Sequence, residues 1–112
     1  MKIPEDGYLL RIFIGESDID GGRPLYEVIV QEAKTAGLAG ATVLRGSMGF
    51  GANSRLHTAK ILRLSEDLPV VIEIVDSKEK INQFIDRIDG RITEGLITLE
   101  KVRVIKYRSN QN

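Results

Sequence analysis

The sequence predicts an α+β domain, a ferredoxin-like βαββαβ sandwich with an antiparallel sheet and two helices on one face. Three observations lead to this prediction. The elements follow the order βα, then a long β–loop–β excursion, then βαβ, which is the order of two split βαβ units. Two segments carry apolar residues at helical spacing. The intervening apolar segments include one especially rich in β-branched residues, which favour strands.

The first strand and the first helix are indicated by the N-terminal third of the chain. Tyr8–Ile14 is almost continuously apolar, which predicts a largely buried strand. An acidic loop follows, and Pro24 then opens a helix at a position where its missing N–H costs nothing. Gly37 provides a natural helix end. The apolar stripe of this helix consists of Leu25, Val28, Ile29, Ala33 and Ala36.

The middle of the chain contains three further strand candidates. These are Ala41–Arg45, Thr58–Leu64 and Leu68–Val75, and Ser65–Asp67 is predicted to form a tight turn between the last two. The excursion at about 49–58 connects the first of them to the second.

The C-terminal part predicts a helix and a closing strand. Asp76 is expected to cap the helix, with Glu79 as its returning partner. Ile97–Tyr107 is the expected strand, and a change in alternation between Leu99 and Val102 suggests a bulge or a break. The helical stripe has the spacing i, i+3, i+4, i+7 and consists of Ile81, Phe84, Ile85 and Ile88.

The sheet of this predicted fold has two apolar faces. The two helices cover only one of them, and no third helix is expected for the other. An apolar sheet face left exposed indicates self-association. The sequence therefore predicts that copies of this chain bind one another through the second face.

Length and composition restrict the function. A chain of 112 residues fits one domain, residues 1–112. The formal net charge is zero, from 16 basic and 16 acidic side chains, which argues against a nucleic-acid binder. No apolar run has the roughly 18–20 residues of a membrane span, so no membrane insertion is expected. Cysteine is absent, so there are no thiolate metal ligands, and a cytoplasmic location is the default.

Two glycine-rich turns carry the strongest functional signal. One is Gly49-Phe50-Gly51 and the other is the turn 90–95, Gly-Arg-Ile-Thr-Glu-Gly, which the fold is expected to place near the first. Glycines allow backbone N–H groups to approach an anion closely. The cations nearby in sequence or at strand ends are Arg55, Arg91, Lys106 and Arg108. The pattern favours a small phosphorylated ligand, although each turn alone is also a plausible structural connection. The polar loop 51–57 between strands is more typical of binding than of stability.

The sequence gives little support for an enzymatic site or a metal-binding site. His57 is the only histidine, and no His-x-x-His spacing accompanies it. A triad of Ser54, His57 and an aspartate lacks a nucleophile-elbow pattern. Arg11, Glu73 and Arg45 lie inside strands, where they are expected to pair on one sheet face or across a subunit interface. No enzymatic activity is expected.

The arrangement resembles the PII signal-transduction superfamily, and in particular its uncharacterised PII-like branch. Gly40-Ala41-Thr42-Val43 and Gly49-Phe50-Gly51 are similar to the second strand and the base of the T-loop. The turn 90–95 is similar to the B-loop, and Lys106-Tyr107-Arg108 to the basic strand end. The resemblance covers most of the chain. It implies a homotrimer with nucleotide-binding clefts between subunits.

The resemblance also assigns roles to residues. It implies a nucleotide site formed by Thr42, Gly49, Phe50, Gly51, Gly90, Arg91, Glu94, Gly95, Lys106 and Arg108. It implies a mobile, partner-binding loop formed by Ala52, Asn53, Ser54, Arg55, Leu56 and His57. No catalytic or metal-binding residue is implied.

Departures from the family pattern narrow the choice of ligand. Leu96 replaces the lysine that follows the B-loop, which favours AMP, ADP or cyclic AMP over ATP. No tyrosine stands between Gly51 and Leu68, so uridylylation is not expected. The leading hypothesis is a non-enzymatic regulator that needs no cofactor, binds an adenine nucleotide and controls a partner protein such as a transporter or regulator. The alternatives are a CutA-like divalent-metal-binding protein and an enzyme acting on phosphate esters, with Glu94 as its base.

Overall fold

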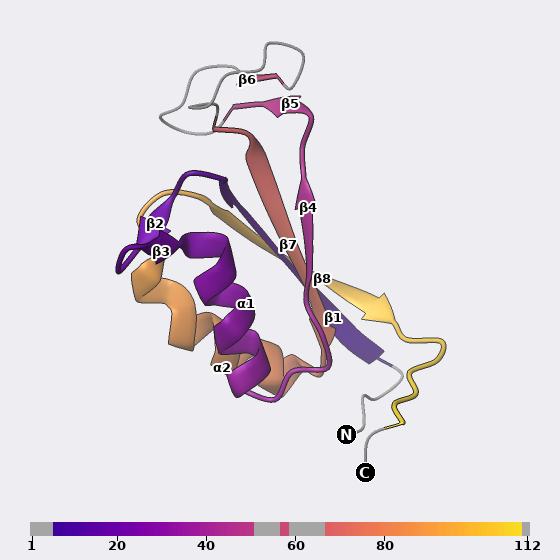
Figure 1. The fold of residues 1–112 in the computed structure, drawn as a ribbon. Helices are drawn as coiled ribbons and strands as arrows, with labels where there is room; N and C mark the ends of the chain where they lie inside the picture. Colours follow the sequence, from indigo (N-terminus) through magenta and orange to yellow (C-terminus); the bar gives the residue numbers. More distant parts are fainter. Residues whose placement is uncertain (1–5, 51–56, 59–66, 111–112) are drawn as a thin grey trace.

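The computed structural model describes residues 6–50, 57–58 and 67–110, and it confirms the predicted α+β sandwich (Figure 1). The main sheet has four antiparallel strands in the order β4-β7-β1-β8. Their bounds are β1 Asp6–Gly15, β4 Thr42–Arg45, β7 Pro69–Asp76 and β8 Leu96–Arg103. Two short hairpins project from it: β2 (Ile19–Asp20) with β3 (Arg23–Pro24), and β5 (Met48–Gly49) with β6 (His57–Thr58).

Both helices lie on one face of this sheet, as predicted (Figure 1). Helix α1 spans Leu25–Thr35, α2 spans Lys78–Ile88, and a short 3-10 turn, η1, covers Asp89–Arg91. The core lies between the helices and the sheet, and its removal from water is the main stabilising contribution. It consists of Leu10, Ile12, Ile14, Leu25, Ile29, Ala33, Val70, Ile72, Ile74, Ile81, Phe84 and Ile88.

The N-terminus of α2 differs from the prediction by one residue. Ser77, not Asp76, is the N-cap, and its hydroxyl accepts a hydrogen bond from the Lys80 backbone N–H at 3.3 Å. Asp76 is fully buried, and its carboxylate accepts bonds from the N–H groups of Ala39 (2.9 Å) and Ser77 (2.7 Å). Asp76 therefore ties the segment after α1 to the end of β7.

The closing strand is shorter and more regular than predicted. Strand β8 pairs with β1 without interruption from Asp6↔Arg103 to Phe13↔Leu96, so the predicted bulge or break is wrong. Leu99 lies on the helix-covered face opposite Leu10, whereas Val102 lies on the other face opposite Gly7. The change in apolar alternation between Leu99 and Val102 therefore arises because one regular strand carries apolar residues on both faces.

The strand candidate Thr58–Leu64 and the turn Ser65–Asp67 fall mostly outside the described residues. Only the backbone of Thr58, paired with Met48, and Asp67 are described from these two segments. The carboxylate of Asp67 accepts a 2.8 Å hydrogen bond from the Ser17 N–H and so connects the start of β7 to the loop after β1.

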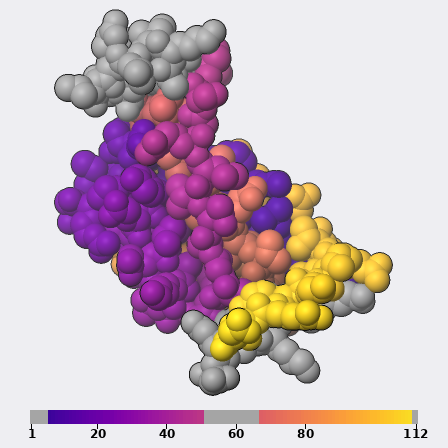
Figure 2. Space-filling view, turned by 45° about the vertical axis from the view of Figure 1, so that its right-hand side comes forward, coloured from indigo at the N-terminus to yellow at the C-terminus, as the bar shows by residue number. Residues whose placement is uncertain are grey.

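The second face of the sheet carries apolar side chains around one ionic cluster, and no described helix covers it. The space-filling view shows the sheet at the surface, from β4 (magenta) through β7 (salmon) and β1 (indigo) to β8 (gold) (Figure 2). Arg11 stands at its centre and donates 2.9 Å hydrogen bonds to Glu73 and to Glu100. The bond to Glu73 is the main cause of a raised Arg11 pKa. The predicted Arg11–Glu73 pairing is present, whereas Arg45 pairs with Glu16 instead. The apolar residues of this face are Leu9, Phe13, Leu44, Val71, Val75, Leu96 and Val102.

Candidate functional site

The two glycine-rich turns lie at the same end of the sheet but at its opposite edges. Gly49 follows edge strand β4, and a Cβ placed on it would lie 2.9 Å from Pro69 Cγ, at the start of β7. Gly95 precedes edge strand β8 and packs against the end of β1. Three strand spacings, about 14 Å, separate the two edges. The described residues of the two turns therefore share an end of the sheet but lie on opposite edges, so the expectation that they lie close together is met only along the strand direction.

The two glycines of the turn 90–95 are not equivalent. Gly95 has φ of 155°, and a Cβ placed on it would lie 2.7 Å from the Phe13 carbonyl oxygen, a backbone atom that cannot easily move. A Cβ on Gly90 would meet no atom within 4 Å, and its φ is not positive. A side chain at Gly95 would therefore disturb the approach of the turn to β1, whereas one at Gly90 would not block the turn.

This asymmetry gives a testable expectation. Gly95→Ala should lower the free energy of unfolding by about 1–3 kcal/mol, because it combines an unfavourable backbone conformation with a backbone clash. Gly90→Ala is the matched control and should change stability by less than about 0.5 kcal/mol. Urea unfolding at one protomer concentration measures both, and equal losses in the two variants would contradict the assignment.

Arg91 is held by two carboxylates from other elements. Its Nη1 donates a 2.5 Å hydrogen bond to Asp20 Oδ2 in β2, and its Nη2 lies 3.5 Å from Glu32 Oε2 in α1. Glu32 also accepts a 2.5 Å bond from Arg87 Nε in α2. The bond to Asp20 is the main cause that raises the Arg91 pKa above its usual value. These four residues form an ionic network that joins the hairpin β2–β3, both helices and the turn at 90–95.

Asp20 and Glu32 are the residues of this region that the sequence analysis missed. They stand 71 and 59 positions before Arg91 in the chain. Salt bridges at helical spacing can be recognised in a sequence because the partners are three or four residues apart. No such local signal exists here, and the pairing depends on how the hairpin packs beside α1.

The other proposed cations lie at the far end of the sheet. Lys106 and Arg108 follow β8, which begins beside Phe13 and ends opposite Asp6, about 25 Å further along. Both are exposed in the irregular segment near the C-terminus (Figure 1). One chain thus does not bring them to the glycine turns. Thr42 lies on the uncovered sheet face opposite Glu73, and Glu94 is exposed within the second turn.

The loop assigned to partner binding is only partly described. Gly51 and the segment 52–56 lie outside the described residues, and only the backbone of His57 is described, where it pairs with Gly49. Phe50, at the start of the loop, is 72% exposed. Within residues 6–50 and 67–110, no three histidines or acidic residues gather closely enough to hold a metal ion. No helix in the described part of the chain is long and apolar enough to cross a membrane.

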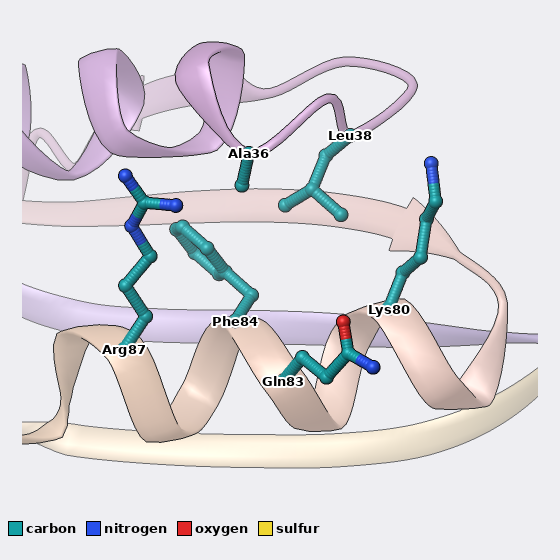
Figure 3. Close-up of a pocket in the computed structure, with 6 residues that line it drawn as sticks. All are labelled: Ala36, Leu38, Lys80, Gln83, Phe84 and Arg87. Atoms are coloured by element: carbon teal, nitrogen blue, oxygen red, sulfur yellow. The ribbon is translucent and has the colours of Figure 1, made fainter.

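A shallow groove lies elsewhere, between the end of α1 and the outer side of α2 (Figure 3). Phe84 forms its buried apolar floor, and Leu38 closes it from the segment after α1. Lys80 and Arg87 flank it, but Lys80 already donates to the Gly37 carbonyl and Arg87 to Glu32. The groove has about 180 Å³ of space and is distinct from the glycine turns.

The arrangement of helices and sheet is that of PII-like proteins. The structure of CPII from Thiomonas intermedia K12 bound to ADP and bicarbonate matches with a TM-score of 0.67 at 14% identity, over 90% of each chain. A second structure of this nitrogen regulatory PII-like protein, bound to ADP, AMP and bicarbonate, gives a TM-score of 0.68 at 14% identity, again over 90% of each chain. At this level of identity the likeness concerns the fold.

The chain belongs to the DUF190 family, described as Uncharacterized ACR, COG1993, which matches residues 7–104. A UPF0166 protein of Aquifex aeolicus (strain VF5) is 45% identical over 97 residues, 87% of this chain and 91% of that protein. UPF0166 protein MJ1524 of Methanocaldococcus jannaschii is 36% identical over 99 residues, 88% of this chain and 91% of that protein. The prediction of an uncharacterised family with a PII-like fold is confirmed.

Proposed function

We propose that this protein is a non-enzymatic PII-like regulator that binds an adenine nucleotide between subunits of a homotrimer and controls a partner protein through the loop 51–57. The observation that carries the proposal is the position of the two glycine turns, at one end of the sheet and on opposite edges. A ligand that uses both turns is most simply accommodated where an edge of one copy meets the opposite edge of the next.

The nature of the ligand follows from the groups available at these turns. Exposed backbone at Gly90 and Gly95, together with the guanidinium of Arg91, suits phosphate oxygens. The fold is shared with CPII, whose structures contain ADP and AMP, and this supports an adenine nucleotide. Lys106 and Arg108 lie too far from the turns of their own chain, so they contribute to a site only if a neighbouring subunit supplies them.

The uncovered sheet face supports the oligomeric part of the proposal. Phe13 and Val75 are half-buried on this face within one chain, and Leu44 (48%) and Leu96 (57%) are substantially exposed. Large apolar side chains left exposed on a sheet face mark an interaction site. Arg11 gives both Glu73 and Glu100 an ion-pair partner at the centre of the face, which leaves this cluster with one net negative charge instead of two unpaired carboxylates.

Calorimetric titration of the purified protein with AMP, ADP, ATP and cyclic AMP tests the nucleotide site. We expect at least one of them to bind, and Arg91→Ala to weaken it about ten- to a hundredfold, because a charge-assisted bond is worth about 1.5–3 kcal/mol. Lys34→Ala removes an exposed cation from α1 and is the matched control, with affinity unchanged within about twofold.

The outcomes separate the parts of the proposal. If the wild-type protein binds none of the four nucleotides at millimolar concentration, the nucleotide function is wrong. If a nucleotide binds equally well to Arg91→Ala, the ligand is right and its phosphate lies elsewhere.

A further inference from the structure

Two of the five N–H donors of Arg91, one on each Nη atom, already face carboxylates. A guanidinium binds phosphate most strongly when it donates two parallel N–H hydrogen bonds. In this structure Nη1 donates to Asp20 and Nη2 is directed to Glu32. A phosphate that takes these two Nη donors therefore competes with the two carboxylates for Arg91.

The contacts of Arg91 are of a kind that an anionic ligand can replace. The three side chains are partly exposed, at 39% for Arg91, 29% for Asp20 and 22% for Glu32. Ion pairs exposed to this degree are weak, because water screens them and can solvate the separated partners. Glu32 would also keep its bond to Arg87 when Arg91 leaves. Departure of Arg91 would thus leave no buried, unpaired charge.

Asp20 connects this exchange to the hairpin β2–β3. The hairpin is a ladder of two residue pairs closed by Gly21 and Gly22, both with positive φ. Its base is fixed by a 2.8 Å bond from the Leu25 N–H to the Asp18 carbonyl. The Arg91–Asp20 bond joins the hairpin to the turn at 90–95. Losing it removes a support from a short element that has little ladder of its own.

We propose that Asp20 and Glu32 hold Arg91 in an inhibitory contact, that a phosphate bound at the turn 90–95 through the two Nη atoms displaces this contact, and that the exchange loosens the hairpin β2–β3. This inference rests on the proposed nucleotide function and adds its regulation. Asp20 and Glu32 lower the affinity of the turn 90–95 for phosphate. The hairpin β2–β3 becomes more mobile when the nucleotide is bound. Ile19, 70% exposed on this hairpin, lies on the surface that would change.

The first test measures affinity for AMP and ADP by calorimetry in wild type, Asp20→Asn and the matched control Asp86→Asn. Asp86 is an exposed carboxylate on α2, so its loss changes the net charge equally. We expect Asp20→Asn to bind about two- to fivefold more tightly than wild type, the range expected when one exposed ion pair no longer opposes binding. Asp86→Asn should bind like wild type. The gain should vanish when Asp20→Asn is combined with Arg91→Ala, because the cation for which carboxylate and phosphate compete is then absent.

The second test follows amide hydrogen exchange in residues 19–23 with and without saturating AMP or ADP. Exchange there should become faster when nucleotide is added to wild type, and should already be fast in Asp20→Asn without ligand. If wild type binds a nucleotide but Asp20→Asn binds no more tightly than Asp86→Asn, the inhibitory contact is refuted and the proposed function stands. If neither wild type nor Asp20→Asn binds at millimolar concentration, both proposals fail.

Discussion

Phe13→Asp should convert the assembled protein to monomers while each subunit stays folded. Phe13 lies on the uncovered sheet face opposite Val71 and Leu96, and its side chain points away from the helix-covered core. Closing an interface over a new carboxylate would leave an unpaired buried charge, which costs several kcal/mol for each copy. Sedimentation at micromolar concentration should therefore show a trimer for wild type and a monomer for the variant.

The control for this prediction is Ile19→Asp. It introduces the same charge at a large apolar residue that is 70% exposed, but on the hairpin β2–β3 and not on the sheet face. It should leave the assembly intact. Circular dichroism of Phe13→Asp establishes that the subunit is still folded. A wild-type protein that sediments as a monomer, or a Phe13→Asp variant that remains trimeric, would contradict the assignment of this face.

Phe84→Ala should lower the free energy of unfolding by about 3–5 kcal/mol, the range observed when a buried aromatic ring is removed. Phe84 is 1% exposed and packs in the core between α2 and the sheet. It also forms the floor of the groove between the helices, so its loss opens the core beneath that groove (Figure 3). Phe84→Leu should retain much of the lost stability, because it keeps most of the apolar volume.

The matched control is Phe50→Ala, the same substitution at a residue that is 72% exposed. Its effect on stability should stay within about 0.5 kcal/mol. Urea unfolding is followed for both variants at one protomer concentration, because the stability of an oligomer depends on concentration. Similar losses in the two variants would mean that the core is not centred on Phe84.

Local patterns in the sequence were sufficient for the elements that bury a repeating apolar face. The stripe of Ile81, Phe84, Ile85 and Ile88 predicts α2; three of its members are buried, and Ile85 is half-buried against the core. The β-branched run Val70–Val75 predicts β7, which is a central strand of the sheet. Such patterns succeed because the period of the backbone, 3.6 or 2 residues, decides which side chains share a face.

The same local patterns were less accurate at the boundaries. Ser77 caps α2 because Asp76 is used in the core, where it accepts two backbone hydrogen bonds. Burial of Asp76 therefore decides that the neighbouring Ser77 is the N-cap. Strand β8 ends at Arg103, four residues earlier than predicted, and carries apolar residues on both faces without a bulge.

By itself, the sequence determined the class of fold, the two helices on one sheet face, and the glycine-rich character of the two turns. Only the tertiary structure decided that these turns lie on opposite edges of the sheet, with Lys106 and Arg108 at its other end. Only packing brought Asp20 and Glu32 to Arg91, across 71 and 59 positions of chain. The physical reason is the sequence separation of the contacts. Periodicity reflects residues that are a few positions apart. Strand order and ionic partners depend on segments that meet only after the chain has folded.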